Sequence, residues 1–321
     1  MKANTKGITA ALASAFFLGM APVFGKQAIL LGIPPLAVVA ARTLLASLLL
    51  LGVMALFYRP YFYIYPAGLL GCLLAGAING IGSLFYYSAL GRINANLGHL
   101  LYSLYPLFLV LWLSLDRQPT SRLTLFRLAL ALPAILLLTQ TESGKIDLIG
   151  VAEMLVASAL YALHLPINQR VLYDMPAPTV TLYTLIAMSA VVVPTFLISS
   201  SFADQSTSLT GDLAQAAWRP VVGLALVTFF SRLTLFTGVK HLGGMQTALL
   251  GLSEILVALT FAYLWLGEGF TTQQWLGAAL LCASLALVAF EQPPPRKQGT
   301  GGFLSWLRPA GVPIETWQSD N

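Results

Sequence analysis

Charged residues are scarce in this sequence. Of its 321 residues only 9% are charged, whereas 57% are hydrophobic. Soluble domains carry about 25% charged residues, and a chain with far fewer cannot build a surface that faces water. The composition therefore excludes a soluble globular protein and indicates a protein that crosses a membrane several times.

The sequence also lacks the short motifs of several function classes. It contains no His-Glu-x-x-His pair, no Gly-x-Ser-x-Gly turn and no Walker A loop, so neither an enzyme nor an ATP-driven pump is expected. No run of basic residues points to nucleic-acid binding. The only two cysteines, Cys72 and Cys282, lie in apolar runs without metal-ligand spacing. We therefore predict no cofactor and no metal site.

Long apolar runs are what the sequence does contain. At about 20 residues per membrane span plus a short connector, the chain has room for about ten spans. The runs are continuous rather than alternating, which favours transmembrane helices over a barrel. We predict an all-α membrane protein with helices over Ile8–Leu31, Pro34–Tyr58, Ile64–Leu90, Asn94–Leu115, Leu123–Thr139, Leu148–Val171, Pro178–Ile198, Pro220–Val239, Met245–Leu266 and Thr272–Phe290. Ser199–Trp218 is the one long connector expected.

The basic residues between the spans predict the orientation. With the N-terminus inside, ten fall on the inner side and three on the outer side: Lys2, Lys6, Arg59, Arg117, Arg122, Arg170, Lys240, Arg296, Lys297 and Arg308 against Arg92, Lys145 and Arg219. Positive charge gathers on the cytoplasmic side of membrane proteins. Both termini are therefore expected in the cytoplasm.

The two halves of the chain resemble each other. Ser14, Phe17, Pro22 and Lys26 match Ser158, Tyr161, Pro166 and Arg170 at a constant offset of 144 residues. A repeat of five spans makes the second copy enter from the opposite side, as in many secondary transporters. We predict two inverted repeats, 1–141 and 142–290, followed by a poorly ordered cytoplasmic tail over 291–321.

Several segments resemble a known family. They are Phe24-Gly25-Lys26, Ala41 to Ala46, Leu104-Tyr105-Pro106, Ser253-Glu254, Leu264 to Glu268 and Gln274 to Gly277. With them the chain is similar to the drug/metabolite transporter superfamily, of the ten-helix EamA type. The resemblance implies two inverted five-helix repeats and export of small metabolites across the cytoplasmic membrane. It departs from the family at Glu254-Ile255, where Glu-Pro is frequent, and at Leu115-Asp116-Arg117.

Ionisable groups inside apolar spans are costly and need a partner or a cavity. On the sixth span Glu153, Tyr161 and His164 lie on or beside one helix face, which predicts a wall of the substrate path and a possible proton carrier. The alternative places Glu153 at the outer surface, with His164 hydrogen-bonded to a neighbouring helix. On the fourth span His99 and Tyr102 share a face that suits an amino or aromatic metabolite, or else binds a neighbouring helix.

The remaining candidates are mostly cationic. Arg232 and Glu254 reach similar depths on adjacent spans, where a buried ion pair would serve gating, binding or helix packing. Lys26 and Arg42 approach each other near the outer side and offer a docking place for an anion, although Lys26 also has the length to snorkel outward. Arg127 is expected to snorkel to the inner surface.

These observations together favour a secondary-active transporter that exports small organic metabolites, such as amino acids, by alternating access. Its partners would be the small-molecule substrate, the lipid bilayer and protons as a coupling ion. A carrier of phosphorylated sugars or nucleotide sugars is the alternative of related fold. A membrane receptor or assembly protein is the alternative of another class, which the inverted repeat disfavours.

Overall fold

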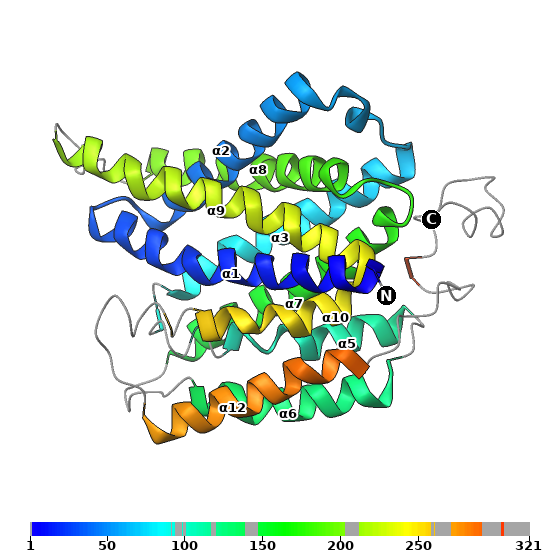
Figure 1. The fold of residues 1–321 in the computed structure, drawn as a ribbon. Coiled ribbons are helices and arrows are strands. Elements are labelled where there is room, and N and C mark those ends of the chain that lie inside the picture. The colour runs from blue at the N-terminus through cyan, green and yellow to red at the C-terminus, as the bar shows by residue number, and fades with distance from the viewer. Residues whose placement is uncertain are drawn as a thin grey trace.

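The protein is an α-helical bundle in the computed structural model, which describes residues 2–90, 92–93, 98, 101–116, 120–138, 147–202, 212–257, 260, 271–290 and 303–304. Each predicted span coincides with helix in these ranges. The helices are α1 (Lys2–Leu30), α2 (Pro35–Phe57), α3 (Pro66–Leu90), α5 (Tyr105–Leu115), α6 (Arg122–Leu138), α7 (Leu148–Leu172), α8 (Ala177–Phe202), α9 (Asp212–Leu242), α10 (Gly244–Gly251) and α12 (Thr272–Ala286), with 3-10 turns at Arg59–Phe62 and Leu287–Phe290 (Figure 1).

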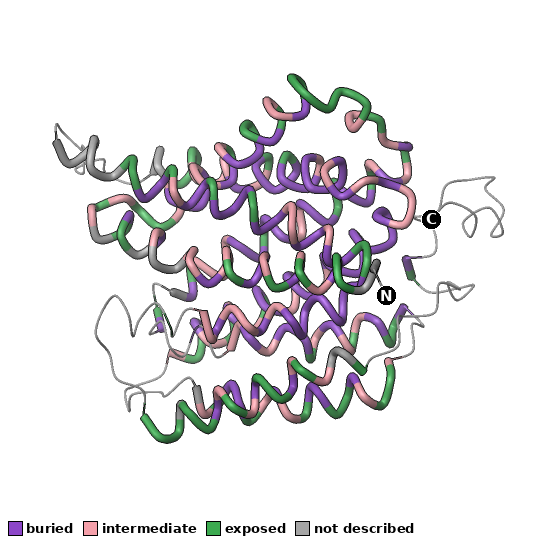
Figure 2. The backbone as a smooth tube through the Cα atoms, in the orientation of Figure 1, coloured by how far each residue is buried: buried purple, intermediate pink, exposed green. Residues whose placement is uncertain are grey.

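Five helical segments among the described residues are long and apolar enough to cross a membrane. They are Pro35–Phe57, Pro66–Ala89, Leu148–Leu172, Ala177–Ser199 and Trp218–Leu242. Shorter apolar helices cover Thr5–Ala21, Tyr105–Leu115, Gly244–Val257 and Trp275–Ala286. Many large hydrophobic residues stay exposed, which suits contact with lipid. Exposed residues lie along the outer helices of the bundle (Figure 2).

The packing of the helices repeats between the two halves. In the first half the helices follow the order α1, α2, α3, α5, α6, and in the second half α7, α8, α9, α10, α12. The first helix of each half packs along the third helix of the other, as α1 on α9 and α7 on α3. Two further pairs of matching contacts occur. α2 contacts α9 as α8 contacts α3, and α5 contacts α7 as α10 contacts α1. A two-fold relation between the halves produces such pairing.

The two halves run in opposite directions through the bundle. α1 begins where α9 ends, because Gly7 faces His241 and Leu242. α7 begins at the other end, where Gly150 faces Arg92 and Ile93. We call the end at which α1 begins the N-terminal end and the opposite one the far end. The predicted fold of two inverted five-helix repeats is confirmed.

Glycines allow the closest helix contacts in this bundle. A Cβ atom at Gly76 of α3 would lie 2.5 Å from both the Ala187 Cβ and the Thr184 carbonyl oxygen of α8. Gly80, one turn later, faces Val191 and Met188 of the same helix. Both glycines therefore let α3 approach α8 closely.

Several expectations from the sequence need correction, three of them here. The connector at Ser199–Trp218 is shorter than expected, because α8 continues to Phe202 and α9 begins at Asp212. Arg127 does not snorkel but is fully buried: its Nε donates to the Ser284 carbonyl oxygen at 3.1 Å, and its guanidinium also donates to Gln246 Oε1. Arg170 is not a solvated connector charge, since it is buried in the last turn of α7.

Candidate functional site

Four tyrosines from both repeats meet in the middle of the bundle. Ring centroids lie 4.9 Å apart for Tyr86 of α3 and Tyr102, 5.3 Å for Tyr102 and Tyr161 of α7, and 5.0 Å for Tyr161 and Tyr105 of α5. Tyr102 lies in the helical turn that precedes α5. Rings at such spacing attract one another and present both flat faces and hydroxyl groups. We call these four residues the tyrosine cluster.

A buried cation lies on the tyrosine cluster. The guanidinium carbon of Arg232, on α9, is 5.8 Å from the centroid of the Tyr161 ring, within cation–π range. Arg232 is 8% exposed, and its Nη1 atom is buried without a hydrogen-bond partner. A guanidinium with a free donor at such a place is suited to bind an anionic group.

His164 lies on the other side of Tyr161. Its ring centroid is 4.8 Å from that of Tyr161 and 6.3 Å from that of Phe236 on α9. One ring nitrogen, Nδ1, contacts the Tyr161 carbonyl oxygen within α7, while Nε2 is buried without a partner. The structure thus leaves one unsatisfied nitrogen on each of two neighbouring side chains, Arg232 and His164, beside the same tyrosine.

Glu254 adds the opposite charge to this region. It is partly buried in the helical segment that follows α10, and its charge interacts with that of Arg232. The predicted ion pair is absent, however: within the described residues no ion-pair contact joins Glu254 to Arg232. Glu254 also interacts electrostatically with Tyr102, Tyr105 and Tyr161, so both charges act on the tyrosine cluster.

Arg42 forms a second cationic position. This residue of α2 places its guanidinium carbon 5.5 Å from the ring centroid of Tyr87, the neighbour of Tyr86 on α3. Its Nε is buried without a hydrogen-bond partner. Lys26, its predicted companion, lies in α1, but its side chain is outside the described part of the structure, as is His99 altogether.

Glu153 stands apart from the tyrosine cluster at the far end. The side chain pairs with Arg92, whose Nε lies 3.5 Å from its Oε2. Arg92 also reaches Asp147, the N-cap of α7, at 3.6 Å. The carboxylate of Asp147 accepts hydrogen bonds from the backbone N–H groups of Gly150 and Ile149, which lowers its pKa. The structure therefore places Glu153 in a half-exposed charge network and His164 in the core.

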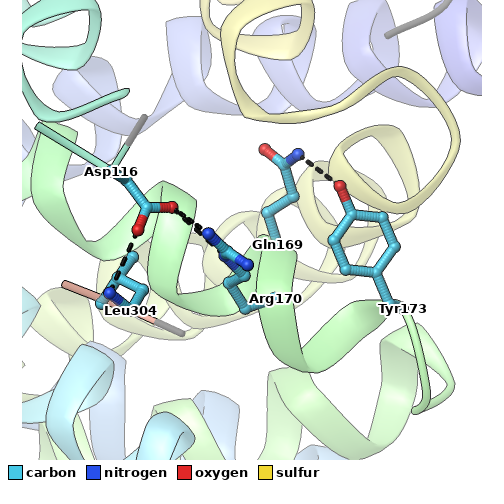
Figure 3. Close-up of polar contacts among 5 residues, drawn as sticks. All are labelled: Asp116, Gln169, Arg170, Tyr173 and Leu304. Carbon is cyan, nitrogen blue, oxygen red and sulfur yellow. Dashed lines mark hydrogen bonds and ion pairs between the residues drawn. The ribbon is translucent and has the colours of Figure 1, made fainter. Parts of the chain in front are cut away.

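Polar contacts join helices at the N-terminal end of the bundle, and one of them crosses between the repeats (Figure 3). Asp116, directly after α5, accepts hydrogen bonds from Arg170 Nη2 at 2.5 Å and Nε at 3.2 Å. Gln169 beside it donates to the Tyr173 hydroxyl at 3.0 Å and accepts from the Gly244 N–H at 2.7 Å. Both members of the Asp116–Arg170 pair are buried. Such a pair favours one arrangement of the repeats, because separating it would leave two buried charges uncompensated.

A second set of contacts lies at the same end, between α7 and α8. The Tyr65 hydroxyl donates to Asp174 Oδ2 at 3.2 Å, and Lys240 Nζ donates to the Met175 carbonyl oxygen at 3.3 Å. Burial raises the pKa of Asp174 to about 6, although the Tyr65 hydrogen bond and the charge of Lys240 act in the opposite direction.

Sequence reasoning missed Tyr86, Tyr105 and the Asp116–Arg170 pair. Tyr105 was visible only as part of a family motif, and Asp116 only as a departure from one. Their partners lie far along the chain, 54 residues apart for Asp116 and Arg170, so no local pattern reports the contact. No cluster of three metal-ligating side chains occurs within the described ranges.

The fold and the central polar groups define a membrane transporter built from two inverted repeats. The model of the EamA-like transporter family matches residues 5–140 and 148–290. The chain belongs to this family, which is of the drug/metabolite transporter type. Among curated proteins none matches it. A solved structure described as "Crystal structure of protein" shares 15% identity with a TM-score of 0.72, over 89% of this chain and 97% of that one. At that identity the likeness concerns the fold alone.

Proposed function

We propose that this protein exports small organic metabolites, such as amino acids, across the cell membrane by alternating access. The observation that carries the proposal is the tyrosine cluster with two opposite charges near it, Arg232 over the Tyr161 ring and Glu254, which form no ion pair with each other. A guanidinium binds a carboxylate, while a carboxylate and aromatic faces bind an ammonium group. A zwitterion of amino-acid size satisfies both charges at once.

Alternating access follows from the inverted halves. Two related units can exchange conformations, so that a site between them opens first to one side and then to the other. Residues from both halves, Tyr102 and Tyr105 from one and Tyr161 and Arg232 from the other, surround the proposed site. The buried Asp116–Arg170 pair would hold the N-terminal end closed in the conformation described here.

The orientation belongs to the same proposal. Basic residues gather at the N-terminal end, which we assign to the cytoplasm, so both termini face it. Export then requires that the N-terminal end opens to load substrate. His164 and Glu254 are our candidates for coupling a proton to transport: the His164 ring packs on Tyr161, and the charge of Glu254 interacts with that of Arg232.

The test is efflux from liposomes that contain the purified protein and a pooled set of metabolites, followed by mass spectrometry with and without a proton gradient. The expected result is selective loss of amino acids compared with protein-free liposomes. Arg232→Lys should slow it by about tenfold or more, because a single ammonium group cannot replace a forked donor. Arg122→Gln removes an exposed charge from α6 and should leave efflux unchanged. Retention of every metabolite by folded protein would contradict export.

A carrier of phosphorylated sugars is the second candidate. Arg42 and Arg232 each hold a buried nitrogen without a hydrogen-bond partner, and two guanidinium groups suit a phosphate better than one. The same pooled experiment separates the two functions. Loss of sugar phosphates with retention of amino acids would favour this carrier, and Arg42→Gln should then impair efflux as strongly as Arg232→Gln.

A further inference from the structure

One residue of the C-terminal segment is buried against the bundle. Leu304 is 1% exposed and packs with Ala75 of α3 and Ile167 of α7. Ile78 and Leu163, from the same two helices, pack against this group. A large apolar side chain in such surroundings is excluded from both water and lipid. Leu304 thus has defined packing partners.

The backbone of Leu304 also joins the buried ion pair. Its N–H donates to Asp116 Oδ1 at 3.1 Å, while Asp116 Oδ2 holds the guanidinium of Arg170 (Figure 3). The two carboxylate oxygens thus serve different partners. An N–H that donates to a charged acceptor makes a stronger bond than one to a neutral acceptor. A main-chain donor is available in any residue but proline.

Leu304 bridges the two repeats at one end of the bundle. Asp116 and Ala75 belong to the first repeat, whereas Arg170 and Ile167 belong to the second. Opening of the N-terminal end between the repeats has to separate some of these groups. Each contact that exists only in the closed arrangement shifts the equilibrium towards it.

We propose that Leu304 acts as a latch: it docks on Asp116 and between α3 and α7, and thereby holds the N-terminal end closed and slows the transport cycle. The occupant of this place between α3 and α7 is thus a residue of the same chain. The inference rests on the proposed function, because a latch on the substrate-loading end matters only in an alternating-access transporter. Removal of the latch should speed opening at the N-terminal end.

The docking is tested first, without any substrate. In a background of Cys72→Ala and Cys282→Ala, the double variant Ala75→Cys/Leu304→Cys should be cross-linked in membranes by a short bifunctional thiol reagent that forms reducible disulfide links. Phe303, 44% exposed, provides the matched control, because Ala75→Cys/Phe303→Cys should cross-link much less. Equal cross-linking of the two pairs would overturn the docking.

The latch is tested next by opening and by transport. Native Cys72 is fully buried on α3, one turn before Ala75. In a Cys282→Ala background, Leu304→Pro removes the N–H donor and should raise maleimide labelling of Cys72 by about tenfold, whereas Phe303→Ala should not. In liposomes Leu304→Pro should raise the initial efflux rate by several-fold. The Ala75→Cys/Leu304→Cys variant should show less than a tenth of the efflux rate when cross-linked that it shows after reduction.

The two proposals fail in different ways. Efflux that is absent from wild type and every variant would contradict the transport proposal, and the Cys72 labelling would still decide the latch. Unchanged Cys72 labelling in Leu304→Pro would overturn the latch. So would efflux at an equal rate in the cross-linked and reduced protein.

Discussion

Arg127 shows how a single residue fixes two elements of this bundle. Its guanidinium joins α6 to the Ser284 carbonyl of α12 and to Gln246 of α10. Gln246 in turn donates to Thr124 Oγ1, one turn before Arg127. The Ser284 hydroxyl donates back to the Arg127 carbonyl at 2.9 Å. Every partner is buried, so the network leaves little room for a substitute.

Replacement of Arg127 by Met should destabilise the protein by about 3 kcal/mol, because it leaves buried acceptors on Gln246 and Ser284 without a donor. The measurement is the thermal unfolding midpoint in detergent. Arg122→Met makes the same change on the same helix at an exposed position and should cost no more than about 0.5 kcal/mol. Equal midpoints for the two variants would contradict a structural role for Arg127.

Asp174 predicts a pH dependence of stability at the N-terminal end. Burial raises its pKa to about 6 from 3.8, so the folded protein binds a proton that the unfolded chain has released between these values. The stability contribution of this group is therefore largest at low pH and is lost as the pH rises from about 4 to 6. Tyr65 and Lys240 are the titratable groups that contact this loop.

The expected result is a smaller drop in the unfolding midpoint between pH 5 and pH 7 for Asp174→Asn than for wild type, since the amide does not titrate. A matched change at the other end of α7, Asp147→Asn, should leave the drop in this pH range intact, because the pKa of Asp147 is lowered instead. An equal change of the unfolding midpoint between pH 5 and pH 7 in wild type and in Asp174→Asn would contradict the assignment.

At the scale of elements, the contact of α3 with α8 depends on one missing side chain. Gly76→Ala would place its Cβ 2.5 Å from a backbone oxygen of α8, which cannot move aside as a flexible side chain would. The helices would have to part, at a cost of about 1–3 kcal/mol. Gly52→Ala on α2 meets no atom within 4 Å and should be neutral or slightly stabilising. Thermal unfolding of the two variants checks the prediction, which an equal effect of both would contradict.

The elements themselves were largely predictable from the sequence, because a span in lipid needs a long apolar run and little else. Which face of each helix is buried was not predictable. Leu125 and Phe126 are exposed while Arg127 is buried, and no apolar periodicity separates these neighbours in a chain that is hydrophobic on all sides. The prediction that Arg127 snorkels was wrong for this reason.

At the scale of the whole molecule, the repeat was predictable and its cross-contacts were not. An odd number of spans per repeat dictates the inversion, so the paired packing of α1 on α9 and α7 on α3 follows from the order of the spans. The tyrosine cluster requires Tyr86, Tyr102 and Tyr161 to converge from three parts of the chain. Only Tyr102 and Tyr161 of these were recognised, from the polar faces of their own helices.

The Asp116–Arg170 pair ties one repeat to the other and should behave as a unit. Asp116→Leu leaves the buried guanidinium without its carboxylate and should lower the free energy of unfolding by about 3–5 kcal/mol. Arg170→Met leaves the buried carboxylate without its guanidinium and should have a similar effect. The double variant Asp116→Leu/Arg170→Met removes both charges and should regain most of the loss, so a double-mutant cycle should give a coupling energy of about 2 kcal/mol or more.

Leu304 loses its acceptor in that variant. The double variant should therefore fold like wild type yet label at Cys72 as readily as Leu304→Pro, which separates the stabilising role of the pair from its role in holding the tail. Additive single losses would show that the pair does not couple the repeats.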